Sequence, residues 1–230
     1  MFSLSAMELS ALGLSLQVAV TAVAVTLPIG IGIAWVLVRL RFPGRLLLDG
    51  IVHLPLILPP VVIGYLLLIG FGRRGVVGSW FWETFGLSIA FTWKGAAMAA
   101  GVMAFPLMVR AIRQALEAVD PKLEQAARTL GASPLSVFLT VTLPLILPGI
   151  LTGVILAFAR SLGEFGATIT FVSNIPGETR TLPLALYTAV QSPGGEEAAL
   201  RLVVISVVLA LGALIASEVL SRRVRARRED

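Results

Sequence analysis

The residues of this sequence that could do acid–base or metal chemistry are few and scattered. The chain of 230 residues has one histidine, His53, and no cysteine, which excludes thiol catalysis, disulfides and zinc–thiolate or iron–sulfur sites. A single histidine offers no cluster of metal ligands, and the apolar runs hold no clustered carboxylates. For His53 we expect a hydrogen bond to a neighbouring helix rather than a proton relay. We therefore expect no catalytic residue and no bound metal.

The chain also has no nucleotide site of its own. The pattern Gly-x-x-x-x-Gly-Lys-Ser/Thr, whose backbone N–H groups cradle phosphates, does not occur. We expect no cofactor on this chain, and any hydrolysis of ATP has to take place on a partner.

The chemistry that remains is that of one charged pair and a run of hydroxyl groups. Glu164 follows a long apolar run, and Arg160 precedes it by one helical turn, which predicts an ion pair. Such a pair fits either an outer gate or an interfacial salt bridge with no further role. Phe165, between Gly163 and Gly166, suits a bendable constriction. The hydroxyl and amide side chains that follow suit the passage of an oxyanion, and a solvated outer loop has the same composition: Thr168, Thr170, Ser173 and Asn174.

An apolar composition dictates which elements position these residues. Hydrophobic residues make up 57% of the chain and charged residues 13%, whereas a soluble domain carries about 25% charged residues. A bilayer core is crossed by about 20 apolar residues of helix. We expect an all-α integral membrane protein in which residues 1–230 form one transmembrane domain. A sixth apolar segment, 182–191, is too short to span and is expected to lie at the surface. The predicted spans are residues 11–38, 50–72, 88–109, 137–159 and 202–221.

The basic residues predict how the spans are oriented. Most of the 18 basic residues are arginines between apolar runs, which favours the flanks of membrane helices over a nucleic-acid surface. With the N-terminus outside and the C-terminus inside, twelve basic residues lie on the inner side and six on the outer side, which agrees with the positive-inside rule. The inner residues are Arg39, Arg41, Arg45, Arg110, Arg113, Lys122, Arg128, Arg222, Arg223, Arg225, Arg227 and Arg228.

Proline and glycine are dense in the second and fourth predicted spans. Pro59 and Pro60 lie in the second span, and Pro144 and Pro148 lie in the fourth. Each proline removes a backbone donor and bends a helix. This pattern favours a moving bundle of helices over a passive anchor.

The inner segment between the third and fourth spans predicts two short helices around a glycine turn. Asp120 and Pro121 form a helix start, and Gly131 is able to take the left-handed conformation that ends a helix. Ser133 and Pro134 repeat the start signal. Small side chains on such a helix leave a surface that can seat in another protein's groove, and on spacing alone a plain cytoplasmic loop fits equally well.

The sequence of this segment resembles the EAA loop of ABC-importer permeases. Residues 124–131 and 141–144 follow that pattern, with Gln125 where the family usually has Glu and Val141 where it has Ile. Glu124, beside Gln125, is expected to compensate for the missing carboxylate. In that family the loop forms the coupling helix that docks on a cytoplasmic ATPase. The resemblance therefore implies an ATPase-binding set of Leu123, Glu124, Gln125, Ala126, Ala127, Leu130, Gly131 and Pro144.

Other stretches resemble molybdate-importer permeases in particular. These are residues 41–45, 49–55, 162–168 and 174–179, and the likeness covers nearly the whole chain. It implies a five-helix, type I importer core in the bacterial inner membrane, surrounded by lipid. It also implies three protein partners: a second copy of the chain, an ATPase dimer that carries ATP and Mg, and an external molybdate-binding protein.

Three other functions are alternatives to this one. A permease for sulfate or tungstate would transport a tetrahedral dianion like molybdate. A secondary transporter driven by an ion gradient would show an internal repeat and charges near the bilayer midplane, and the sequence shows neither. A membrane enzyme would need a constellation of reactive groups that the composition does not supply.

Overall fold

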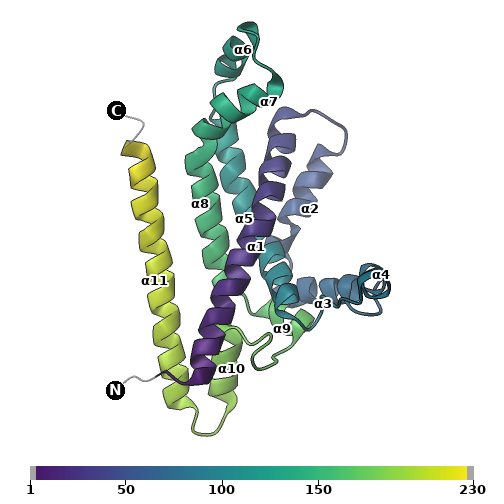
Figure 1. The fold of residues 1–230 in the computed structure, drawn as a ribbon, viewed down its shortest axis with the longest axis vertical. Helices are drawn as coiled ribbons and strands as arrows, with labels where there is room; N and C mark the ends of the chain where they lie inside the picture. The colour runs from purple at the N-terminus through teal and green to yellow at the C-terminus, as the bar shows by residue number, and fades with distance from the viewer. Residues whose placement is uncertain (1–3, 227–230) are drawn as a thin grey trace.

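The chain folds into helices, the longest of which run along one common axis. The computed structural model describes residues 4–226, and within that range it has helices and no strand. Four helical segments are long and apolar enough to cross a membrane: α1 (Ala6–Arg39), α5 (Trp93–Glu117), the run Pro134–Leu162 that ends in α8, and α11 (Glu196–Ala226). Figure 1 shows α1, α5 and α8 side by side, with α11 along the outside of the bundle. The predicted all-α membrane class is therefore confirmed.

The first helix begins at a capping box. The Ser5 hydroxyl accepts from the Glu8 N–H, and the Glu8 carboxylate accepts from the Ser5 N–H at 2.7 Å. The same carboxylate, which is buried, pairs with Arg201 of α11 at 2.9 Å. The predicted span 11–38 lies inside α1, and the capping box ties its first turn to the start of the last helix.

Small side chains allow α1, α5 and α8 to approach closely. Ala96, Ala99 and Ala100 of α5 are fully buried. A Cβ added at Gly149 of α8 would collide with the Ala115 side chain of α5. In lipid such backbone proximity supplies the van der Waals contact that holds helices together, because the surrounding chains are as apolar as the helices.

The second predicted span, 50–72, is two helices joined by a sharp bend rather than one continuous helix. It consists of α2 (Arg45–Ile57) and α3 (Pro60–Phe71), whose axes differ by 117°. Pro59 and the residue before it, Leu58, are both extended (ψ 136° and 145°), because the ring of a proline pushes the preceding residue out of the helical region. Pro60 then starts α3 at the first helical position, where its missing N–H costs nothing. The pair forms either a broken span or a re-entrant loop.

The third predicted span, 88–109, is shifted toward the C-terminus. Thr92 caps α5 by accepting from the Gly95 N–H, and Phe91 before it has a positive φ of 63°, so the preceding residues form a turn. At the other end α5 continues past Arg110 to Glu117. The helix therefore extends beyond the predicted span on this side.

The fourth span contains an irregular turn that the sequence did not predict. It begins as α7 (Pro134–Val137), widens into the π-helix η1 (Phe138–Thr142) and continues as α8 (Leu143–Leu162). The predicted limits 137–159 lie within this run. The last span, predicted at 202–221, is longer at both ends in α11, and Arg227 and Arg228 of the inner tail lie outside the described residues.

The short apolar segment 182–191 is a helix, α10 (Leu182–Gln191), in which Tyr187 and Val190 are exposed and other residues are buried. Leu182 and Ala185 are buried in one cluster with Ala11 of α1 and Leu202 of α11. The Leu182 N–H donates to the Ser15 hydroxyl of α1 at 2.7 Å. The helix therefore packs against the ends of α1 and α11 (Figure 1).

Two further helices had no counterpart in the prediction. α4 (Val76–Phe85) follows α3, and Figure 1 shows both helices lying across the long axis of the bundle. α9 (Gly166–Val172) packs against α3 and α5. α4 has ten residues and α9 has seven, so both are shorter than a span.

Candidate functional site

The predicted pair of helices around a glycine turn, in residues 120–136, is confirmed. Asp120 caps α6 (Pro121–Thr129), its carboxylate accepting from the Lys122 N–H at 2.9 Å. Gly131 has φ +88°, and two backbone bonds close the helix end: the Ala132 N–H donates to the Ala127 carbonyl and the Gly131 N–H to the Arg128 carbonyl. This is a Schellman motif.

A second cap starts the next helix immediately. The Ser133 hydroxyl accepts from the Ser136 N–H and caps α7, as the Ser-Pro pair predicts. These local bonds turn the chain back toward α8 and leave α6 at one end of the bundle. Figure 1 shows α6 and α7 there, on the side where α1 and α11 end.

The outer face of this helix pair exposes leucines. Leu130 is 89% exposed, Leu135 68% and Leu123 48%. Gln125 and Ala126 of α6 are exposed as well, and Ala127 is half-buried. Three exposed leucines at the tip of a protein, rimmed by polar residues, are typical of a protein-binding surface. We call Leu123, Leu130 and Leu135 the leucine face.

Glu124 does not belong to this outer surface. Its carboxylate accepts from Arg39 Nη2 at 2.8 Å and from the Thr142 hydroxyl at 2.8 Å, and its side chain is only 15% exposed. The carboxylate that is expected to compensate for Gln125 is therefore engaged within the chain. Its place on α6 directs it toward Arg39 of α1 and Thr142 of η1.

Gly131 and Pro144, the last two members of the predicted ATPase-binding set, follow α6 in the chain. Gly131 is exposed at the turn, and Pro144 lies in the first turn of α8, beyond η1. A groove of about 720 Å³ separates α1 from α6, α7 and η1, with Trp35, Arg39, Glu124 and Phe138 in its wall. Nothing in the sequence pattern signalled this groove, because it forms between segments far apart in the chain.

At the other end of α8, the predicted ion pair is present. Arg160 Nη1 lies 2.6 Å from Glu164 Oε2, and the Glu164 side chain is almost fully buried. The other carboxylate oxygen accepts from the Ala167 N–H at 2.8 Å. Glu164 therefore connects Arg160 of α8 to the first turn of α9, and the charge of Arg160 balances its negative charge.

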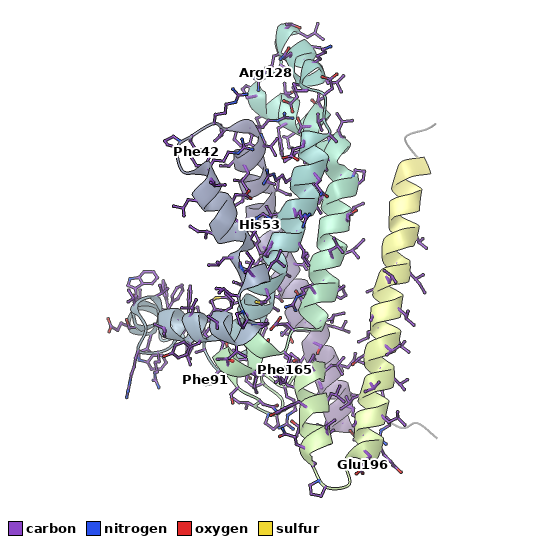
Figure 2. The ribbon with its side chains drawn as sticks, turned by 180° about the vertical axis from the view of Figure 1, so that it is seen from behind. Phe42, His53, Phe91, Arg128, Phe165 and Glu196 are labelled. Atoms are coloured by element: carbon purple, nitrogen blue, oxygen red, sulfur yellow. The ribbon has the colours of Figure 1, made fainter. Side chains whose placement is uncertain are left out.

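Phe165 lies next to this pair, at the start of α9. Its ring centre is 5.1 Å from that of Tyr187 on α10, so it bridges the two short helices. Figure 2 shows Phe165 toward the end of the bundle opposite Arg128. Gly166 beside it touches α3, because an added Cβ would come within 2.7 Å of the Pro60 side chain.

The predicted oxyanion-path residues are divided into two groups. Thr168 is buried within α9, so it lines no open path in this structure. Ser173 is exposed at the end of α9, with a positive φ of 64°. Asn174 links its loop to α10: its amide accepts from Arg180 Nε and donates to the Thr188 hydroxyl, both at 2.8 Å.

His53 bonds within its own helix rather than to a neighbour. Its Nδ1 lies 2.9 Å from the Asp49 carbonyl oxygen and 3.1 Å from the Asp49 carboxylate. The bond between helices comes from Asp49 instead, whose two carboxylate oxygens each lie 3.0 Å from Arg113 Nη1 of α5. His53 thus supports the residue that joins α2 to α5.

A second groove, of about 550 Å³, opens between α1, α2 and α5. Its wall is apolar except for Thr21, Thr26 and Lys94. The ammonium of Lys94 lies 6.0 Å from the centre of the Trp93 ring. The groove leaves the faces of three helices uncovered by the chain itself.

Comparison with known proteins identifies the type of molecule to which this architecture belongs. The model of the family described as binding-protein-dependent transport system inner membrane component matches residues 26–226. The chain is 64% identical over 194 residues to the molybdenum transport system permease protein ModB of Escherichia coli K12, covering 84% of this chain and 85% of that protein. It is 58% identical over 219 residues to ModB of Haemophilus influenzae, covering 95% of this chain and 96% of that protein.

A solved structure shares the fold. The crystal structure of a bacterial alginate ABC transporter, in complex with an alginate pentasaccharide-bound periplasmic protein, has a chain that superposes with a TM-score of 0.76. The match covers 96% of this chain and 80% of that chain at 18% sequence identity. At that identity the likeness concerns the arrangement of the helices.

Proposed function

The chain belongs to the family of binding-protein-dependent transport system inner membrane components, and from this premise we propose that it is the permease subunit of an ABC importer for molybdate. The substrate rests on the molybdenum permeases of two bacteria, to which the chain is 64% and 58% identical. Sulfate is not favoured as the substrate by these relatives. An ion-driven secondary transporter and a membrane enzyme do not fit the family.

The observation that carries the proposal is the leucine face at one end of the bundle. An importer permease works with a separate ATPase, which binds ATP and Mg and hydrolyses ATP, so this chain is itself no enzyme. We assign the docking of that ATPase to α6 and α7, whose exposed Leu123, Leu130 and Leu135 fit a hydrophobic groove. Gln125, Ala126 and Ala127 lie on the same helix and complete the docking set, while Gly131 sets the turn.

The orientation follows from the same assignment. The multi-pass chain lies in the inner membrane with α6 in the cytoplasm, because the ATPase is cytoplasmic. α1 then begins outside and α11 ends inside, in agreement with the excess of basic residues on that side. The end that holds Glu164, Phe165 and α10 faces the external molybdate-binding protein.

The partners within the membrane are a second copy of the chain and lipid. Support comes from the apolar groove between α1, α2 and α5 and from large exposed side chains on α2, among them Leu46, Leu47 and Ile57. A single chain leaves these surfaces open. We assign the groove side to the second copy and the rest of the apolar circumference to lipid.

Transport then requires that closure of the ATPase reaches the outer end. α8 is the direct connection, since it runs from the π-helix beside α6 to the Arg160–Glu164 pair. Pro144 and Pro148 lie in its first two turns, where each removes a backbone bond and allows the helix to bend. We assign Glu164, Phe165 and Thr168 to the outer gate, with Thr168 reached only after the gate opens, and Ser173 and Asn174 to its outer mouth.

The test is uptake of labelled molybdate in cells that lack their own permease, with the chain expressed beside its ATPase and binding protein. Restored uptake that survives excess sulfate is expected, and uptake abolished by sulfate would move the substrate to another oxyanion. Leu130→Ala should lower ATPase co-purification about tenfold, because one anchoring side chain of an interface contributes of order 1–2 kcal/mol. Leu40→Ala, an exposed leucine at the same end of the bundle, is the matched control and should have no effect.

A further inference from the structure

We propose that Glu124 is a positioning residue that connects α6 to both α1 and α8, so that a displacement of α6 moves the two membrane helices together. The inference rests on the proposed function, in which the ATPase pushes on α6. It goes beyond that function because it names the groups that pass the movement on. It also gives Glu124 a role different from the docking role that the loop's resemblance implies.

One carboxylate oxygen of Glu124 accepts two hydrogen bonds. Arg39 Nη2, from the last residue of α1, donates to Oε1 at 2.8 Å. The hydroxyl of Thr142, the last residue of η1 before α8, donates to the same oxygen at 2.8 Å. Arg39 is 85 positions from Glu124 in the chain and Thr142 is 18 positions from it, so three separate segments meet at one atom.

This contact matters because α6 is attached to the bundle by little else. None of the nine residues of α6, all of which the structure describes, is buried. The partners of Glu124 are inside the protein: Arg39 is 20% exposed at its side chain and Thr142 is 2% exposed as a residue. Hydrogen bonds that involve an ionised donor and acceptor are shorter and about twice as strong as neutral ones. Charge-assisted bonding thus replaces the apolar burial that α6 lacks.

The π-helix explains why a link across this point is needed. Between α7 and α8 the backbone widens over Phe138–Thr142, and such single-turn π segments are rare and frequent at functional sites. A push on α6 that travelled along the backbone alone would have to pass through this irregular turn. The bond from Glu124 to Thr142 crosses this π-helix, because Thr142 is the residue immediately before α8. The bond to Arg39 brings α1 into the same movement.

The test uses the complete complex of permease, ATPase and binding protein in lipid vesicles. Molybdate import and phosphate release are measured in the same vesicles, together with ATPase co-purification and melting temperature. Arg39→Gln, Glu124→Gln and Thr142→Val each remove one partner. Arg41→Gln, an exposed arginine in the neighbouring loop with the same loss of charge, is the matched control.

For Arg39→Gln and Glu124→Gln we expect the number of ions imported per ATP hydrolysed to fall at least about fivefold, the lower end of the range for coupling between sites, while the ATPase stays attached. Thr142→Val should give a smaller loss, and Thr142→Ser none. The charge-exchanged double variant Arg39→Glu/Glu124→Arg should recover at least half of the ratio. A residue with a purely structural role would lower the melting temperature and leave the ratio unchanged.

An unchanged ratio in both Arg39→Gln and Glu124→Gln would overturn the proposal, as would an equal loss in Arg41→Gln. A second measurement keeps the test independent of substrate and of yield. Because the chain has no cysteine, single labels can be placed at Lys122 and Arg41 and their distance followed with ATP. The distance should stay constant in the natural chain and change in Arg39→Gln. If the natural chain imports no molybdate, the substrate assignment fails, and the label distance still decides the role of Glu124.

Discussion

Replacing Gly64 by alanine should separate α3 from α9 and lower the stability of the chain. Gly64 is buried in α3, facing α9. A Cβ at this position would lie 2.5 Å from the Ala167 carbonyl oxygen, 2.9 Å from the Ala167 Cα and 2.8 Å from the Thr170 Cβ. Two of these atoms belong to the backbone, so rotation of a side chain cannot relieve the collision. The two helices have to move apart.

The size of the effect follows from two opposing terms. Overpacking of a close contact costs about 1–3 kcal/mol. Alanine is preferred over glycine inside a helix by about 0.5–1 kcal/mol, which offsets part of that cost. A net loss of about 1–2 kcal/mol remains. A chain of this length changes its melting temperature by about 2–4 °C per kcal/mol, so we expect a decrease of about 2–8 °C.

The assay is thermal unfolding of the purified chain in detergent, followed by the fluorescence of its four tryptophans. Gly70→Ala is the matched control, because Gly70 lies on the same helix and no described atom is within 4 Å of its added Cβ. That variant should melt at the same temperature as the natural chain or slightly higher. A Gly64→Ala variant that melts no lower than Gly70→Ala would refute the close contact between α3 and α9.

Three further substitutions test other parts of the structure. Glu164→Gln keeps an acceptor for the Ala167 N–H but loses the ion pair with Arg160. We expect the free energy of unfolding to fall by about 1.5–3 kcal/mol and molybdate uptake to decrease. Unchanged uptake and melting would exclude a gating role. Gly131→Val forces a β-branched residue to φ +88°, which should reduce ATPase co-purification. Gly131→Asn should not reduce it, because asparagine tolerates that backbone region. Full co-purification of the valine variant would contradict the docking role. Ser15→Ala leaves the buried Leu182 N–H unpaired and should cost about 1–3 kcal/mol, measured by melting against Ser10→Ala, and equal melting of the two would contradict the bond.

Features that depend on neighbouring residues could be predicted well. The caps at Asp120 and Ser133 and the left-handed Gly131 were found from the sequence because each involves residues within three or four positions. The pair of Arg160 with Glu164 was found for the same reason. The membrane class followed from the number of apolar residues in a row, a property of the chain that no folding alters.

Features that depend on the degree of bending were harder to predict. Pro59 and Pro60 signalled a disturbance in the second span, and the structure shows a change of direction of 117°. The size of that angle depends on what α3 packs against, above all Ala167 and Thr170 of α9 at Gly64. Proline opens the possibility of a bend, and tertiary contact selects its direction.

The inward direction of Glu124 and the burial of Thr168 could not be read from the chain. Both depend on how far each helix is rotated about its axis, and that rotation is set by partners distant in sequence, such as Arg39, 85 positions away from Glu124. Apolar runs, caps and turns are local, so the linear order of residues decided the class of protein, the inner loop and its helix pair. Packing among α1, α6 and α8 decides which faces those helices present, because only close packing in three dimensions brings their side chains within hydrogen-bonding distance. That packing therefore also decides which charges bind a partner and which hold the fold together.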